Sequence, residues 1–343
     1  MTDFTEFHDE LRSLARGLLA KSAGEPVSWK TVTEAGWPGL AAPPEFDGAG
    51  AGFAEVAVLL GEAGRAAAVT ALPTVLALSV PALAAATADD LRDNIFRETV
   101  TGRTLPVLVL DAGEADNAFA LDDSPAGPVV TGSADFVLDA PAADLLLVPI
   151  PAREELVAVV PDAAGLTITP TPLVDATRSA ARVSADRVAA HAVWHFPDQD
   201  ALRARAAVAV ACDSLGSAEA MLAATVAYVR VREQFGRPVG SFQAVKHACA
   251  DMLVQVTVAG HLVGAAVRAI DEGSADSAIA ASRAKSYATS AAVRVAGAAL
   301  QLHGGFGYTW DSGIHVHLKR ATLNRALYGS PAAHRKKLAA RYH

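Results

Sequence analysis

The sequence predicts an α+β protein with three parts in chain order: an N-terminal helical domain, a middle β domain and a C-terminal helical domain. Two changes of pattern support this prediction. Apolar residues recur at helical spacing towards both ends of the chain, whereas the middle consists of short β-rich runs separated by proline, glycine and aspartate. We place the three domains at residues 1–104, 105–197 and 198–343.

The first domain opens with an apolar stripe at helical spacing, made of Phe4, Phe7, Leu11, Leu14 and Leu18. A passage rich in glycine and proline predicts a loop, and a helix is expected after it, from about Phe53 to Ala66. The middle domain contains the runs LPVLVL, PVVTG, ADLLLVPI, LVAVV and LTITPTPL, which are typical of strands. The third domain is alanine-rich, which suits closely packed helices with an extensive subunit interface.

A long helix is expected at the start of the third domain. Its apolar face consists of Val208, Cys212, Leu215, Leu222, Val226 and Val229. The pattern breaks at residues 235–238, because Pro238 has no amide hydrogen and Gly236 permits backbone angles that a helix does not use. Ser241 is the candidate cap of a second helix, whose apolar face continues through Val245, Cys249, Met252 and Val256.

The corner between these two helices gathers a cation, an aromatic ring and two amides, at Arg232, Phe235, Gln234 and Gln243. Such a group could bind an anion that is part of a ligand with a flat, polar ring system, such as a dinucleotide. An ordinary helical hairpin with a solvated turn is the simpler interpretation, and composition alone favours it.

Composition excludes several classes of protein. The net charge is −8 and no basic run is present, which argues against nucleic acid as a partner. The chain is 52% hydrophobic but has no uninterrupted apolar run of bilayer-spanning length, so no membrane association and a cytoplasmic location are expected. His303, His315 and His317 lack a carboxylate or thiol at a useful spacing, so no metal site is expected.

Two strings of residues change the interpretation of the corner. The string R-x-x-F-G-x-P-x-x-x-F-Q with a later A-D-M is present as Arg232, Phe235, Gly236, Pro238, Phe242, Gln243, Ala250, Asp251 and Met252. The string Q-x-x-G-G-x-G-Y is present as Gln301, Gly304, Gly305, Gly307 and Tyr308. In this order and spacing they resemble the signatures of the flavin-dependent acyl-CoA dehydrogenases, and the resemblance extends over nearly the whole chain.

The resemblance implies FAD as the cofactor and an acyl-CoA as the substrate. In the family, one subunit holds the flavin ring and carries the base, while a neighbouring subunit reaches over to hold the pyrophosphate and adenine half. The residues that this implies for FAD binding are Arg232, Gln234, Phe235, Gln243, Gln301, Gly304 and Gly305.

The chain departs from the family on the side that holds the flavin ring. A threonine-glutamate-proline motif has no match within residues 109–125, and a tryptophan-isoleucine-threonine motif aligns with residues 136–138, which read Phe-Val-Leu. The two positions of the family's catalytic glutamate align with Tyr328 and Ala206, and neither a neutral phenol nor a methyl group is a useful base at pH 7. Asp213 is the nearest carboxylate and is expected to be a helix-surface or interface acid, so no catalytic residue is assigned.

This one-sided loss predicts a subunit that completes the active site of another chain, because a decaying enzyme would lose both sets of residues at random. By resemblance, we expect an actinobacterial α2β2 dehydrogenase of steroid-derived CoA thioesters, with a glutamate-bearing partner subunit and electron-transfer flavoprotein as the electron acceptor. Two alternatives stay open: a self-sufficient homomeric dehydrogenase whose base is displaced, for instance to Asp213, and a non-enzymatic family member kept for assembly or acyl-CoA binding.

Overall fold

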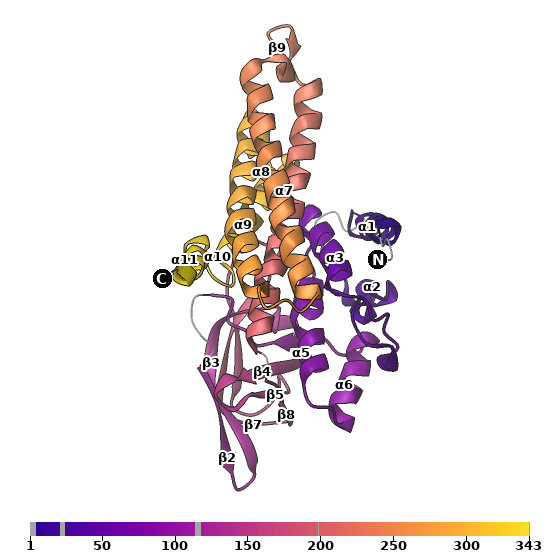
Figure 1. The fold of residues 1–343 in the computed structure, drawn as a ribbon, viewed down its shortest axis with the longest axis vertical. Coiled ribbons are helices and arrows are strands. Elements are labelled where there is room, and N and C mark those ends of the chain that lie inside the picture. Colours follow the sequence, from indigo (N-terminus) through magenta and orange to yellow (C-terminus); the bar gives the residue numbers. More distant parts are fainter. Residues whose placement is uncertain (1–4, 21–24, 114–117, 198, 343) are drawn as a thin grey trace. The chain divides into compact units, whose positions relative to one another are not determined.

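The structure, a computed structural model, describes residues 5–20, 25–113, 118–197 and 199–342. Helices, strands and helices follow one another in the chain, so the predicted fold class is confirmed (Figure 1). The last helix before the strands ends at Val100 and the first strand begins at Pro106. The last strand of the middle part ends at His195, and a long helix begins at Gln199. The predicted boundaries fall in these two connections, and as domain limits they stay a prediction.

The chain packs into two compact units. One contains residues 1–25, 57–68 and 207–343, and the other contains residues 26–56 and 69–206. The N-terminal helices are therefore divided between the two units. Two glycines let residues 57–68 pack closely against the start of the segment 207–343, in the same unit. A Cβ at Gly64 would lie 1.9 Å from the carbonyl oxygen of Asp213, and a Cβ at Gly216 would lie 1.9 Å from the carbonyl oxygen of Gly61. Only glycine allows such a close approach of two helix backbones.

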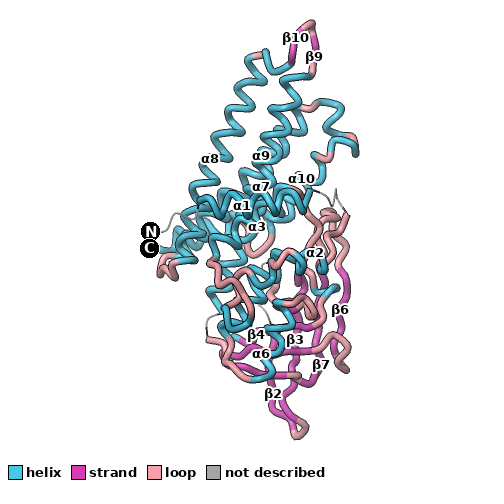
Figure 2. The backbone as a smooth tube through the Cα atoms, turned by 90° about the vertical axis from the view of Figure 1, so that its right-hand side faces the viewer, coloured by secondary structure: helices cyan, strands magenta, loops and turns pink. Residues whose placement is uncertain are grey.

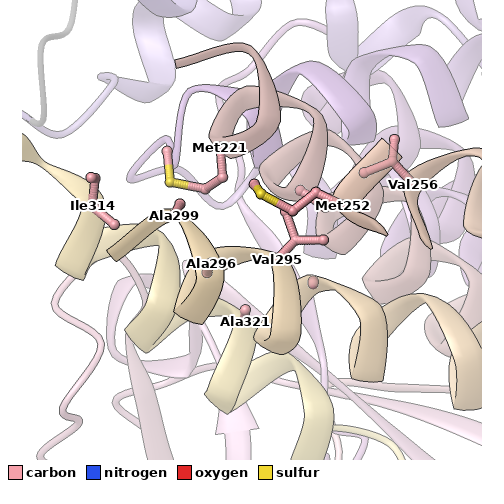
Figure 3. Close-up of a cluster of buried hydrophobic side chains, with 10 residues drawn as sticks. Met221, Met252, Val256, Val295, Ala296, Ala299, Ile314 and Ala321 are labelled. Atoms are coloured by element: carbon pink, nitrogen blue, oxygen red, sulfur yellow. The ribbon is translucent and has the colours of Figure 1, made fainter. Parts of the chain in front are cut away.

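The first unit is helical, and its elements are α1 (Thr5–Ala20), most of α3 (Phe53–Arg65), most of α7 (Gln199–Val231), α8 (Gln243–Asp271), α9 (Ser277–Leu302), α10 (Ile314–Ala326) and α11 (Pro331–Ala339). Helices α7, α8 and α9 run side by side as a long bundle (Figures 1 and 2). Its core is formed by small and flexible side chains, including Met221 of α7, Met252 of α8, Val295 of α9 and Ala321 of α10 (Figure 3). Alanine on the facing surfaces lets these helices approach closely, as the composition predicts.

The predicted stripe on the first helix is partly wrong. Helix α1 exists, but Leu14 is 70% exposed, and the buried face consists of Leu11, Ala15 and Leu19. These residues are four apart and therefore lie on one face of the helix. Ala15 is fully buried and takes the place in the core that the stripe assigned to Leu14, and Phe4 lies outside the described residues.

The second unit contains the β part and several shorter helical elements. Apart from 3₁₀ turns, these include α2 (Trp29–Glu34), α4 (Leu72–Thr74), a π-helical turn (Val75–Ser79), α5 (Val80–Ala85) and α6 (Asp90–Val100). One four-stranded sheet has the order β1 (Pro106–Leu108), β4 (Leu145–Ile150), β5 (Glu155–Val159) and β8 (Ala192–His195). The other has the order β2 (Ala118–Ser124), β3 (Gly127–Leu138), β7 (Ala180–Ala189) and β6 (Leu166–Pro170). Within these two sheets β1 and β4 pair in parallel, and the other neighbouring strands are antiparallel.

Two of the described helices, α7 and α8, are long and apolar enough to cross a bilayer by length and composition alone. In the most apolar 18-residue stretch of each helix, 72% is buried inside the protein for α7 and 28% for α8. A core helix of a soluble protein passes the same test. The expectation of no membrane span therefore stays a prediction.

Candidate functional site

The predicted break between the two long helices is a tight hairpin at the tip of the bundle (Figures 1 and 2). Strands β9 (Glu233–Gln234) and β10 (Arg237–Pro238) pair across a turn in which Phe235 and Gly236 have φ angles of 55° and 76°. Positive φ at both central residues is the feature of a type I′ turn, whose twist suits a two-residue hairpin. A short 3₁₀ segment, Val239–Ser241, then leads into α8.

The predicted cap at Ser241 is wrong. The residue that precedes α8 is Phe242, which makes no capping hydrogen bond through its side chain. The turn holds Phe235 at a positive φ, which is costly for an aromatic residue. Phe235 is also 90% exposed. Strained backbone positions cluster at functional sites, so Phe235 is a candidate ligand contact.

A pocket of about 620 Å³ lies between this hairpin and the segment that follows α9. Six predicted site residues line it, namely Arg232, Gln234, Phe235, Gln301, Gly304 and Gly305. The structure thus brings together two motifs that are far apart in the sequence. Gln243 is not among the lining residues, and its amide nitrogen lies 2.8 Å from Nε2 of His247.

The pocket also includes residues that the site prediction did not contain: Tyr228, Val239, Phe242, Val245, Leu302, His303 and Phe306. Part of this set was available from sequence. Tyr228 precedes Arg232 by one helical turn, so the two lie on the same side of the chain. Phe306 occupies a variable position of the second string, Q-x-x-G-G-x-G-Y, which specifies no residue type there.

The chemistry of the pocket fits the diphosphate and adenine half of a dinucleotide. Arg232 is exposed, and its planar guanidinium can donate to two phosphate oxygens at once. Gln234 and Gln301 supply exposed amides. A Cβ at Gly304 or Gly305 would meet nothing within 4 Å, so space is left for a ligand to reach the backbone of this turn.

Neither position aligned with a catalytic glutamate holds an acid. Ala206 is buried in α7 and is 1% exposed. Tyr328 follows α10 in a strained conformation, with φ at 53°, and is half-buried.

The prediction that Asp213 is a surface or interface acid is wrong, because its side chain is 1% exposed inside this chain. Its Oδ2 accepts from Nη2 of Arg320 at 2.6 Å and its Oδ1 accepts from Nε of the same residue at 3.0 Å. Asn324 donates a further hydrogen bond to Oδ1 at 2.6 Å. A carboxylate with both oxygens occupied in this way is a poor candidate for taking a proton from a substrate.

The residues that replace the family's flavin-ring motif lie at the end of β3. Val137 and Leu138 are buried, at 0% and 6% exposure, and Phe136 donates its backbone amide to the carboxylate of Asp111 at 3.3 Å. Asp111 also accepts from the amides of Gly113 and Asp135, both at 2.7 Å. This stretch therefore offers packing in place of a hydroxyl and an indole. Residues 114–117 of the neighbouring unmatched motif lie outside the described residues.

The three histidines considered for a metal lie in separate surroundings. His303 stacks on Tyr228, His315 lies against Trp310, and His317 has its Nδ1 2.9 Å from the hydroxyl of Ser217. Burial lowers the pKa of His317 to about 4. Across the part of the chain that the structure describes, no three metal-ligating side chains gather.

Comparison with known proteins identifies the family. The family models "Acyl-CoA dehydrogenase, N-terminal domain" and "Acyl-CoA dehydrogenase, C-terminal domain" match residues 5–103 and 199–343. The acyl-CoA dehydrogenase IpdE2 of Mycolicibacterium smegmatis is 30% identical over 344 residues, which cover 98% of this chain and 94% of that protein.

Two solved structures extend the comparison. A variant of the Tcur3481–Tcur3483 steroid ACAD has a TM-score of 0.87 and 27% identity, with 98% of both chains covered. The ChsE4–ChsE5 complex of Mycobacterium tuberculosis has a TM-score of 0.89 and 23% identity, over 100% of this chain and 98% of that one. The fold thus defines a class of flavoenzyme, and the chain belongs to the acyl-CoA dehydrogenase family, whose cofactor is FAD.

Proposed function

We propose that this chain is the subunit of a heteromeric acyl-CoA dehydrogenase that completes the FAD site of a glutamate-bearing partner. The observation that carries the proposal is the contrast between its two sets of site residues. The pocket lined by Arg232, Gln301 and the paired glycines is intact, whereas both positions aligned with the base hold Tyr328 and Ala206. An enzyme that worked alone would need a positioned carboxylate to remove the α-proton of its substrate.

These residues assign part of FAD binding to this chain and proton removal to the partner subunit. When bound, FAD accepts the hydride from the β-carbon of the CoA thioester. Arg232 neutralises charge on the diphosphate, and the turn at Gly304 and Gly305 lets the nucleotide approach the backbone. The proton is taken by a glutamate of the partner subunit.

The substrate proposed is a CoA thioester derived from a steroid, and the assembly proposed is α2β2 with electron-transfer flavoprotein as the acceptor. The support for the substrate is the likeness to a steroid ACAD at 27% identity over nearly the full length of both chains. The support for a partner subunit is that likeness together with the missing base.

The burial and the hydrogen bonds of Asp213 argue against a homomeric dehydrogenase in which this residue is the base. A displaced base must reach the substrate, whereas Asp213 is 1% exposed and is bound to Arg320 and Asn324. No observation favours the purely structural alternative over the heteromer, since a chain kept only for assembly has no need of an intact nucleotide pocket.

Flavin content tests the proposal. Purified alone, the chain should be colourless or weakly flavinated and inactive, and co-expressed with a glutamate-bearing family member it should form a yellow complex with about one FAD per two chains. Arg232→Ala in that complex should weaken FAD binding by about 10- to 100-fold, because charged hydrogen bonds are among the stronger ones.

Arg230→Ala is the matched control. This arginine is exposed and close in sequence, but it lines a different hollow, and the variant should retain full flavin content. The proposal fails if the chain purifies alone with one FAD per chain and oxidises an acyl-CoA.

A further inference from the structure

One wall of the pocket is a stack of aromatic rings that no motif describes. Tyr228 forms the middle of the stack. Its ring centroid lies 4.3 Å from that of His303 at an interplanar angle of 22°, and 6.0 Å from that of Phe306 at 9°. All three side chains line the pocket, so the stack faces the space in which a ligand would bind.

Hydrogen bonds fix the orientation of the His303 and Tyr228 rings. His303 is 6% exposed, and its Nδ1 lies 2.8 Å from the backbone oxygen of Ala299. Because a carbonyl oxygen only accepts, Nδ1 carries the proton and donates it there. The Tyr228 hydroxyl donates to the backbone oxygen of His303 at 3.3 Å. Both rings are thereby held in orientation, and they support the third.

Phe306 ends the stack on the solvent side. Its side chain is 45% exposed, and it follows Gly304 and Gly305, next to which an added Cβ would meet nothing within 4 Å. A supported ring that borders open space offers a face to a flat ligand. Phe235 is a weaker platform, since its ring meets that of Phe242 edge-on, with the two ring centroids 6.1 Å apart.

Resting on the proposed function, we propose that Phe306 is the platform on which the adenine ring of FAD stacks. Arg232 then holds the diphosphate at the hairpin side of the same pocket. Stacking suits this position, because a π face binds a purine without hydrogen bonds to its edge. The lining residues of the pocket all belong to one compact unit of this chain, so we expect this chain by itself to bind the adenosine diphosphate part of FAD.

Titration of the full-length chain with ADP tests this inference by calorimetry, with inorganic pyrophosphate as the probe for the phosphate contacts alone. The wild-type chain should bind ADP without any partner. Phe306→Leu keeps an apolar side chain but removes the ring, and should weaken ADP binding by about 5- to 100-fold. Pyrophosphate binding should be unchanged in this variant and weakened in Arg232→Ala.

Two further variants separate stacking from folding. Phe306→Tyr keeps the ring and should bind ADP with the affinity of the wild type. Binding at that affinity also shows that a substitution at this position leaves the pocket folded. Trp310→Leu removes an aromatic side chain that is 79% exposed nearby but does not line the pocket, and ADP binding should be unaffected.

The outcomes distinguish this inference from the proposed function. If Phe306→Leu binds ADP as the wild type does while Arg232→Ala binds it weakly, the platform is overturned and the proposed function stands. Failure of the wild-type chain to bind ADP also overturns the platform, because the pocket would then need the partner. If Arg232→Ala leaves the flavin content of the heteromer unchanged, the proposed function itself is contradicted.

Discussion

At the scale of single residues, the contact between Asp213 and Arg320 places two opposite charges in the interior of the helical unit. The Arg320 side chain is 0% exposed, and besides Asp213 it donates to the backbone oxygen of Ala68 at 3.0 Å. The interior tolerates these charges because each is neutralised and hydrogen-bonded. Removal of one partner leaves the other buried without compensation, which is far more costly than the loss of a surface pair.

Asp213→Asn should lower the free energy of unfolding by about 3–5 kcal/mol, as expected when one partner of a buried pair is removed. Chemical denaturation of the chain measures this. Glu219→Gln is the control, since Glu219 pairs with Arg65 but is 40% exposed, and its loss should cost less than about 1 kcal/mol.

Catalysis should respond differently from stability. Turnover per folded heteromer should be nearly unchanged in Asp213→Asn. A variant that folds with normal stability but has lost turnover would restore Asp213 as a candidate base.

At the scale of elements, the turn between α10 and α11 is tied down from two helices. The amine of Lys285, on α9, donates to the backbone oxygens of Arg325 at 3.3 Å and Gly329 at 3.0 Å. On α11, His334 has its Nε2 3.0 Å from the backbone oxygen of Tyr328. Gly329 has a φ of 100°, and a Cβ there would lie 3.1 Å from the His334 ring, so this position requires glycine. The strained Tyr328 is thus held by its neighbours.

Lys285 gives this turn a pH dependence. Burial lowers the pKa of Lys285 from 10.5 to about 7, and a neutral amine still has two N–H donors for its two carbonyl acceptors. Since the folded pKa is below the unfolded one, the unfolded chain binds more protons between these values. Stability should therefore rise with pH from 7 upwards, and fall as pH drops towards 7.

Lys285→Met should flatten this rise between pH 7 and pH 8.5, as measured by thermal or urea unfolding at several pH values. The window stops there because the pKa of Cys212 is raised by burial from 9.0 to about 12, which opposes the rise at higher pH. Cys212→Ala is the control and should keep the wild-type slope below pH 8.5. An unchanged slope in Lys285→Met would contradict the assignment.

Below pH 6.5 two histidines act in the same direction. Burial lowers the pKa of His317 and His334 from 6.5 to about 4. Both are neutral in the folded protein at pH 6, so stability should be lost as pH falls through this range.

At the scale of the whole molecule, α8 has apolar residues outside its core face that are exposed in the described chain, whereas Met252 and Val256 are buried in the bundle core. Leu253 is 55% exposed, Val254 is 60% exposed and Val258 is 37% exposed, while Val231 at the end of α7 is 76% exposed. Val254 and Val258 are one helical turn apart and share a face. Soluble monomers rarely expose a large contiguous apolar patch. Under the proposed function, this face meets another chain of the heteromer.

Val254→Glu should therefore weaken assembly without unfolding the chain. Light scattering after size exclusion should show smaller species than the co-expressed wild-type complex. Leu14→Glu is the matched control, because Leu14 is a 70% exposed apolar residue on α1, away from this face. Normal assembly of Val254→Glu would exclude this surface as the contact.

The sequence by itself determined the features that depend on near neighbours in the chain. Helical periodicity predicted α7 and α8, and Gly236 together with Pro238 predicted the break between them, because backbone preferences act over a few residues. It missed β7, whose strand residues are largely alanine, serine and charged side chains with little β-propensity. It also pointed to Arg232 and Gln301 as site residues, but only through two separate strings.

Only the tertiary structure decided which of these segments meet. The pocket joins the hairpin to the turn after α9, and the aromatic stack joins Tyr228 to Phe306. Asp213 is buried because Arg320, 107 residues later in the chain, supplies its countercharge. The physical reason is that periodicity reports which face of an element is apolar, whereas burial, pairing and pocket shape depend on what another element places against that face.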